Sequence, residues 1–281
     1  MSAKRAEETM NGRSESIWID GQGAWRIHRS PGERPGLFAL HGFTGSGEDL
    51  LPLAPLIGRA MVAPDLPGHA GTTPLGSWPM TRIVEALGAL CDTVEDRPGI
   101  LMGYSLGGRT ALQLAVTRPS RFSALVLVSS TAGIEDPEER RARRGADEAL
   151  ATRIETDGVE AFLDFWASMP IIATQQHIRS DWRTAMLMRR RAQTARGLAC
   201  SLREVGAGTM PPIWDRLSSL SIPTLLLVGE ADRKYCALAH RLSETLPHAE
   251  CVRIAGAGHC VHLEAPEASA TAIRTFLDEH S

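Results

Sequence analysis

Apolar residues occur in short runs along this chain, and the runs alternate with segments of helical spacing. The runs lie at 36–40, 61–65, 99–103, 124–129, 224–229 and 250–254. A short apolar run bounded by turn residues is typical of a strand that is buried on both faces. Helical spacing is clear at 81–94 and at 266–277. The alternation predicts an α/β fold, with a mostly parallel central sheet covered by helices on both faces.

The first 30 residues separate into a polar segment and a predicted hairpin. Residues 1–15 are polar and charged and lack an apolar stretch, so we expect a disordered N-terminal extension and no signal peptide. Residues 16–28 indicate two short strands around Gly21-Gln22-Gly23. Glycines at such a turn favour a hairpin, so we expect the sheet to begin with antiparallel strands.

The alternation of strands and helices stops between 131 and 214. This stretch has no strand-like run, and its spacing predicts helices at 147–154, 159–166 and 178–191. Strand character returns after Pro211-Pro212. We therefore expect a helical cap at 131–214, inserted into a core formed by 16–130 and 215–281. Such an insertion would lie over the carboxyl ends of the strands, where ligands bind in open α/β sheets.

Gly-Tyr-Ser-Leu-Gly-Gly at 103–108 is the most informative motif of the chain. It fits G-x-S-x-G, with Ser105 between a predicted strand and a predicted helix, which is the context of a nucleophile elbow. Gly103 and Gly107 stand where the two backbones approach closely. Backbone amides at the helix N-terminus can meet a developing negative charge beside Ser105.

A serine hydroxyl needs a histidine within hydrogen-bond reach, and that histidine needs a carboxylate that fixes its tautomer. In the chain order typical of this fold, Asp232 follows the strand at 224–229 and His259 follows the strand at 250–254. We favour these two. Glu230 is the alternative carboxylate and His262 the alternative base, because both lie in the same loops.

His41-Gly42-Phe43-Thr44-Gly45 follows the first core strand. A turn there can direct the Phe43 amide toward Ser105. Together with the Leu106 amide it would form an oxyanion hole, which stabilises negative charge in a transition state.

Composition excludes several classes of protein. The net charge of −3 gives no global field that would favour nucleic acid or an anionic membrane. No apolar run approaches the length of a membrane span. Five scattered cysteines without C-x-x-C spacing indicate neither a disulfide framework nor a zinc site, which favours a cytoplasmic protein. We expect no metal, no cofactor, and a monomer or weak homo-oligomer acting on a small molecule.

These motifs together resemble the α/β-hydrolase superfamily, and within it the MenH-type 2-succinyl-6-hydroxy-2,4-cyclohexadiene-1-carboxylate synthases. Tyr104 before the serine and Arg109 after the glycines are the most specific matches. The other matching segments are Leu-His-Gly-Phe-Thr-Gly-Ser (40–46), Asp-Leu-Pro-Gly-His (65–69), Glu-Glu-Arg-Arg-Ala-Arg-Arg (138–144), Phe-Leu-Asp-Phe-Trp followed by Pro170 (162–170), Gly-Leu-Ala (197–199), Ser-Leu-Arg (201–203) and Asp-Arg-Lys-Tyr (232–235).

The resemblance implies a lyase of menaquinone biosynthesis. Its substrate is 2-succinyl-5-enolpyruvyl-6-hydroxy-3-cyclohexene-1-carboxylate, from which pyruvate is eliminated. Ser105, polarised by His259, would then act as a base rather than as an acylated nucleophile. The alternative is a hydrolase that uses the same triad on a carboxylate-bearing ester or a carbon–carbon bond.

The substrate implied by the resemblance is a polycarboxylate, and arginine binds carboxylates with two parallel hydrogen bonds. The resemblance assigns this role to Arg109, Arg143 and Arg190, and it assigns contact with the ring or the succinyl arm to Tyr104 and Trp166. Arg189 and Arg191 are alternatives to Arg190 in register. The segment 131–214 holds twelve arginines and twelve acidic residues, so most of its charges are expected to pair on helix surfaces. One departure is Gln193, which stands near a position where the family often has asparagine.

Overall fold

The computed structural model describes residues 12–31, 35–72, 76–94 and 99–280. Eight strands in these ranges form one sheet in the order β1-β2-β4-β3-β5-β6-β7-β8. The strands are β1 (Arg13–Ile19), β2 (Gly23–Arg29), β3 (Pro35–Leu40), β4 (Ala60–Pro64), β5 (Gly99–Tyr104), β6 (Phe122–Val128), β7 (Thr224–Gly229) and β8 (Ala249–Ile254). From β4 to β8 neighbouring strands are parallel, whereas β1 and β2 are antiparallel to each other and β2 is antiparallel to β4.

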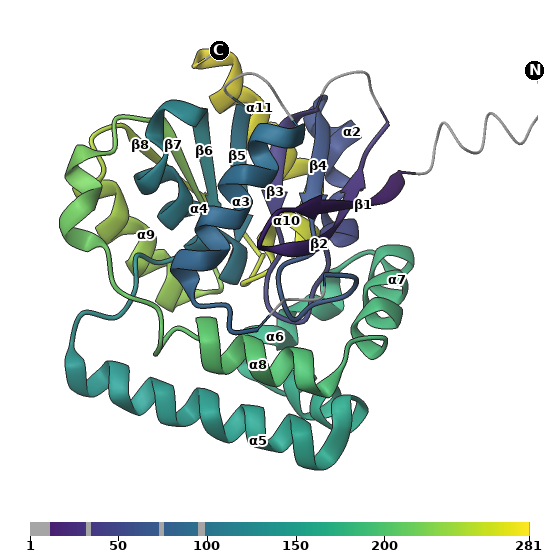
Figure 1. The fold of residues 1–281 in the computed structure, drawn as a ribbon. Helices are drawn as coiled ribbons and strands as arrows, with labels where there is room; N and C mark the ends of the chain where they lie inside the picture. Colours follow the sequence, from purple (N-terminus) through teal and green to yellow (C-terminus); the bar gives the residue numbers. More distant parts are fainter. Residues whose placement is uncertain (1–11, 32–34, 73–75, 95–98, 281) are drawn as a thin grey trace, which may run out of the picture.

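Helices cover both faces of the sheet (Figure 1). They are α2 (Leu53–Ile57), α3 (Met80–Val94), α4 (Leu106–Thr117), α9 (Arg233–Thr245), α10 (Val261–Glu264) and α11 (Pro266–Glu279). Helices α3, α4 and α9 share one hydrophobic cluster with the sheet, and α2, α10 and α11 share the other. The central strands are therefore buried on both sides, which explains their continuous apolar runs. This arrangement confirms the predicted α/β-hydrolase fold.

The N-terminal extension predicted at residues 1–15 overlaps the first strand, so its predicted end is too far along the chain. Residues 1–11 lie outside the described residues, but 13–15 belong to β1 and pair with β2 from Arg13↔Arg29 onward. A hydrogen bond of 2.8 Å joins the Ser14 hydroxyl to the His28 ring, and Arg29 Nε donates to Glu15 at 2.6 Å. Cross-strand polar pairs stabilise this edge, so the strand begins before any apolar residue indicates it.

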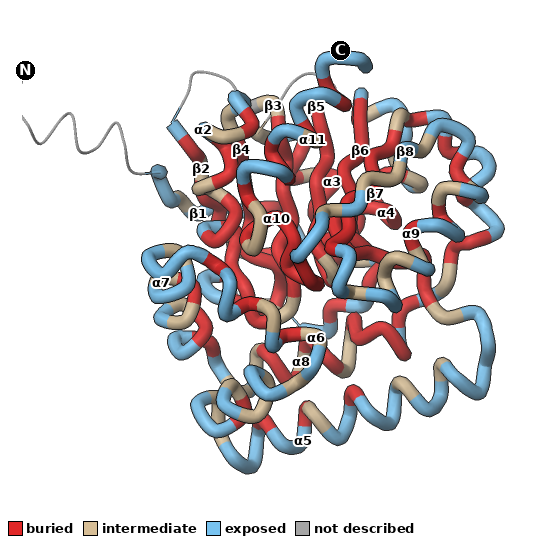
Figure 2. Tube along the Cα trace, turned by 180° about the vertical axis from the view of Figure 1, so that it is seen from behind, coloured by how far each residue is buried: buried red, intermediate tan, exposed pale blue. Residues whose placement is uncertain are grey.

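Four α-helices lie between β6 and β7, below the sheet in Figure 1. They are α5 (Pro137–Ala167), α6 (Pro170–Ala173), α7 (Ser180–Arg191) and α8 (Ala195–Val205). Helices α5 and α8 bury a separate apolar cluster, which includes Ile154, Phe162 and Leu198. The outer side of α5 is exposed along its length (Figure 2).

The structure joins the helices predicted at 147–154 and 159–166 into the single element α5, with a break at Gly158, where φ is 82°. The first ten residues of α5 were missed because they are charged and bury no apolar stripe. Asp136 begins the helix by accepting hydrogen bonds from the Glu138 and Glu139 amides.

In the part of the chain that the structure describes, no helix combines the length and hydrophobicity that a membrane crossing requires.

Candidate active site

Ser105 stands at a sharp turn between β5 and α4. Its backbone has φ 52° and ψ −107°, a conformation that non-glycine residues rarely adopt. The turn brings backbones together, because a Cβ on Gly103 would lie 2.3 Å from the Gly107 carbonyl oxygen. A Cβ on Gly107 would lie 2.1 Å from the Leu40 carbonyl oxygen. These glycines are therefore required for the turn that presents the Ser105 hydroxyl at the sheet edge.

The structure brings Ser105, His259 and Asp232 together. His259 Nε2 lies 3.0 Å from Ser105 Oγ, and His259 Nδ1 lies 2.7 Å from Asp232 Oδ2. The imidazole is buried, and the carboxylate also accepts a hydrogen bond from the Tyr235 amide at 3.2 Å. The Asp232 carboxylate is thus held in place at the start of α9 and can orient the histidine.

The two alternatives lie elsewhere. Glu230 is exposed at the end of β7. His262 is buried in α10, and its ring centroid lies 4.4 Å from that of Tyr104. Burial lowers the pKa of His262 to about 3, so this ring stays neutral at ordinary pH.

The loop after β3 lies beside Ser105. Gly42 packs on the Tyr104 ring, because a Cβ there would lie 2.6 Å from its Cε1. In the described chain, neither the Phe43 amide nor the Leu106 amide donates a hydrogen bond to another residue. Two unpaired amides that flank the serine fit the predicted oxyanion hole, whose role stays a prediction.

A cavity of about 290 Å³ opens over Ser105 and His259. One wall comes from the sheet edge and the other from the helices between β6 and β7. Apolar side chains that line it include Leu150, Met169, Ile171, Ile172, Leu202 and Val205. Tyr104 and Trp166 line the same cavity, and burial raises the pKa of the Tyr104 hydroxyl well above its ordinary value.

Two buried guanidinium groups face this cavity. Arg109 and Arg190 are only 8% and 7% exposed. Arg109 donates to the Val205 carbonyl at 3.1 Å, and Arg190 donates to the Gln175 side chain at 2.8 Å. Neither forms an ion pair with a carboxylate among the described residues. Burial lowers the pKa of Arg109 to about 10, which still leaves it charged at neutral pH.

The other three arginines differ in their surroundings. Arg143 lines the cavity and is paired with the buried Asp147, its Nε 2.9 Å from Oδ1. Arg189 lies outside the cavity and pairs with Asp49 at 2.6 Å, and Arg191 is exposed. The structure thus places Arg190, rather than its two neighbours, at the cavity.

Sequence reasoning missed three polar residues that line the cavity, namely Gln175, Ser201 and Lys234. In the described structure, Gln175 Nε2, Ser201 Oγ and Arg190 Nε are buried without a hydrogen-bond partner. Lys234 lies in the Asp-Arg-Lys-Tyr segment, so its closeness to Asp232 could have identified it. Ser201 lies in the matching segment Ser-Leu-Arg (201–203), whereas Gln175 belongs to no motif.

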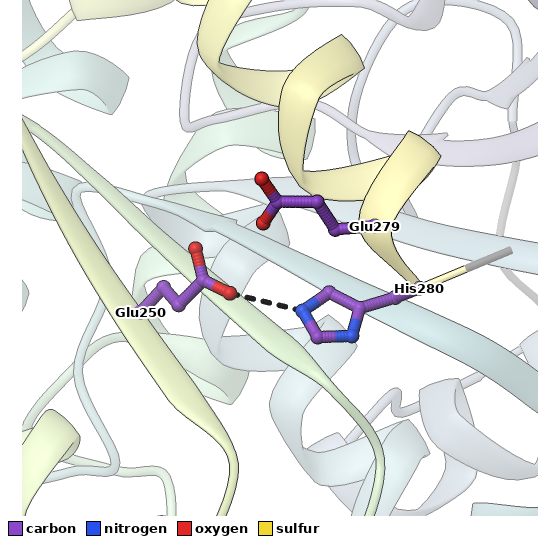
Figure 3. Close-up of side chains that lie close together, drawn as sticks. All are labelled: Glu250, Glu279 and His280. Carbon is purple, nitrogen blue, oxygen red and sulfur yellow. Dashed lines mark hydrogen bonds and ion pairs between the residues drawn. The ribbon is translucent and has the colours of Figure 1, made fainter.

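One group in the described residues has ligand atoms close enough to hold a metal ion, and it lies away from this cavity. Glu250, Glu279 and His280 offer atoms within 4.8 Å of one another (Figure 3). All three are exposed, and His280 Nε2 is already hydrogen-bonded to Glu250 at 2.9 Å. The geometry therefore gives this group no connection to the chemistry at Ser105.

Comparison with known proteins places the chain in a family. Residues 37–272 match the model of the alpha/beta hydrolase family. A Bacillus subtilis (strain 168) protein, provisionally named as a 2-succinyl-6-hydroxy-2,4-cyclohexadiene-1-carboxylate synthase, is 36% identical over 251 residues, which are 88% of this chain and 92% of that protein. The synthase of that name from Pectobacterium atrosepticum is 32% identical over 87% of this chain and 94% of its own length.

The solved structure of MenH from S. aureus superimposes with a TM-score of 0.85 at 28% identity, covering 91% of this chain and 98% of that one. The resemblance noted in the sequence is thereby confirmed. The chain belongs to the alpha/beta hydrolase family and, within it, to the same family as these synthases.

Proposed function

We propose that this protein is a lyase that eliminates pyruvate from 2-succinyl-5-enolpyruvyl-6-hydroxy-3-cyclohexene-1-carboxylate. The product is the 2,4-cyclohexadiene named in its relatives, an intermediate of menaquinone biosynthesis. The division into a core of 16–130 and 215–281 with a cap at 131–214 belongs to the proposal, as does a cytoplasmic location.

The observation that carries the proposal is that the buried guanidinium groups of Arg109 and Arg190 share a cavity with Ser105 and have no carboxylate partner among the described residues. A buried cation without a counterion is costly, and a bound carboxylate would offset that cost. The proposed substrate carries three carboxylates, so it can supply partners to Arg109 and Arg190 and a third to Arg143 or Lys234. An ordinary apolar ester would leave both buried charges unpaired.

The names of substrate and product define the bonds that change. A proton leaves C2, the ring double bond at C3–C4 is replaced by bonds at C2–C3 and C4–C5, and the C5–O bond to the enolpyruvyl group breaks. The departing enolate takes up a proton and becomes pyruvate. This elimination needs a base near C2 and a group that stabilises negative charge on the neighbouring succinyl carbonyl oxygen.

The site can supply both. In the proposed mechanism, His259 accepts the hydroxyl proton while Ser105 Oγ removes the proton from C2. Asp232 holds the resulting imidazolium, and His259 then returns a proton to the departing enolate. The Phe43 and Leu106 amides would bind the negatively charged succinyl carbonyl oxygen. Tyr104 and Trp166 would pack against the ring and the succinyl arm. No acyl-enzyme forms in this series of steps, although the triad is that of a hydrolase.

The experiment is a direct assay of pyruvate release from the authentic substrate. We expect the wild type to release one pyruvate for each diene formed, with no burst of acylated enzyme. If the protein releases no pyruvate from this substrate but hydrolyses simple esters with a burst, the lyase proposal is wrong and the hydrolase interpretation replaces it.

A further inference from the structure

Gln193 connects the segment between α7 and α8 to the loops beside the catalytic serine. Its side chain is buried, with 6% of the residue exposed, and it does not line the cavity. The Nε2 atom donates to the Gly45 carbonyl at 3.0 Å and to the Thr44 carbonyl at 3.3 Å. The Oε1 atom accepts from the Ala70 amide at 2.7 Å. One carboxamide therefore joins two loops that are far apart in the sequence.

Both loops contain backbone that needs such support. Thr44 has φ 66° and Ala70 has φ 41°, in the left-handed region that L side chains rarely adopt. Such a conformation is strained and persists only where its surroundings hold it. The Thr44 turn closes through a 3.1 Å hydrogen bond from the Gly45 amide to the Gly42 carbonyl, so Phe43 lies inside the turn that Gln193 holds.

A second contact reaches the same loop from the end of α7. Arg189 pairs with Asp49 Oδ1 at 2.6 Å, and Asp49 Oδ2 accepts from the Ser46 amide at 3.0 Å. The loop is thus held just after Phe43 by Gln193 and one residue further on through Ser46. These contacts use both hydrogens of the Gln193 amide and one lone pair of its oxygen, and the side chain does not line the cavity.

We propose that Gln193 is a positioning residue that fixes the Phe43 amide in the oxyanion hole by holding the turn at Gly42–Gly45. This inference rests on the proposed role of that amide. It makes the helices over the site responsible for transition-state stabilisation as well as for substrate binding. Because misplacement of a catalytic dipole weakens only the transition state, the effect belongs in kcat rather than in KM.

The test compares Gln193→Ala with Gln176→Ala, a matched change at an exposed glutamine of the same cap. We expect Gln193→Ala to lower kcat for pyruvate release about tenfold or more while KM changes less than about threefold. We expect amide hydrogen exchange at residues 42–46 to become faster. Gln176→Ala should match the wild type in both measurements.

Gln193→Glu adds a second measurement, the pH dependence of kcat, which should not change if Gln193 only stabilises the fold. The ionised carboxylate that this substitution introduces could still accept from Ala70, but it would repel the Thr44 and Gly45 carbonyls, whereas the protonated acid could donate to one of them. We therefore expect the ratio of kcat for Gln193→Glu to kcat for the wild type to rise as pH falls from about 8 to about 6. Taking the ratio removes pH effects that the two proteins share.

Labelling of Ser105 by a fluorophosphonate separates this inference from the proposed function, because that reaction uses the triad and the oxyanion hole without any substrate. Slower labelling of Gln193→Ala together with faster loop exchange supports the positioning role, even if the wild type releases no pyruvate and the lyase proposal fails. Loop exchange equal to the wild type, or labelling and turnover within about twofold of it, would overturn the inference.

Discussion

The two halves of the site are built in different ways. On the sheet side, His259 is already hydrogen-bonded to Ser105 and to Asp232, and each of the three follows the carboxyl end of a strand. On the helical side, Arg190 and Gln175 form one hydrogen bond, yet Arg190 Nε and Gln175 Nε2 remain buried and unpaired in the described structure. The triad on the sheet side is therefore hydrogen-bonded without a ligand, whereas the helical side has buried side-chain donors that still lack a partner.

This difference assigns a task to each half. A hydrogen-bonded triad can transfer a proton as soon as a substrate carbon is placed against it. Buried donors without partners instead define where the carboxylates of the substrate must lie. Changes to the triad should thus lower kcat, and changes to the buried donors that line the helical side of the cavity should raise KM.

The largest effect is expected from His259. His259→Ala removes the group that accepts the proton from Ser105, and we expect kcat for pyruvate release to fall about 10²- to 10⁴-fold. His262→Leu, three residues further on in α10, should lower kcat less than about tenfold, because His262 packs on Tyr104 away from the serine. Steady-state kinetics of both variants checks this prediction. A larger fall in kcat for His262→Leu than for His259→Ala would contradict the assignment of His259 as the base.

Arg190 gives the next largest effect and tests the helical side. Arg190→Met removes a buried charge-assisted hydrogen bond to a substrate carboxylate, and we expect KM to rise about 10- to 100-fold. Arg191→Met is the control, because Arg191 is exposed on the same helix. Equal KM values for the two variants would show that the cavity at Arg190 does not bind a carboxylate.

Arg109 sharpens the comparison because it belongs to α4 of the core but faces the helical side. Arg109→Met should raise KM and lower kcat together, each about tenfold, since the anchor lies one helical turn from Ser105. The melting temperature should not fall, because the change removes a buried charge without a carboxylate partner. An unchanged KM would count against Arg109 as a ligand.

The sequence predicted the sheet side of the site better than the helical side. Strand ends can be located from apolar runs, and the motif around Ser105, together with Asp232 and His259 after two later strands, is local. On the helical side, three consecutive arginines at 189–191 point in different directions around one helix. Packing decides which of them is buried, and no spacing rule expresses that choice. The roles of Gln175 and Gln193 could not be predicted either, because they depend on contacts with residues distant in the chain.

The smallest effect concerns stability and pH. Burial lowers the pKa of His262 to about 3 in the folded protein, well below its value of about 6.5 in an unfolded chain. At this position the unfolded state therefore binds one more proton below about pH 6.5, and His262 should contribute a loss of up to about 1.4 kcal/mol for each pH unit below that point. Urea unfolding of His262→Leu at about pH 7 and about pH 5 should show a shallower loss. A loss as steep as that of the wild type would mean that His262 is protonated in the fold.

The most direct test of the division between the two halves is to measure binding and turnover separately in Ser105→Ala. Calorimetric titration with the authentic substrate should give an affinity close to the wild-type KM, because the arginines remain, while pyruvate release should be lost. Pyruvate release at the wild-type rate, or failure of this folded variant to bind the substrate, would contradict the account.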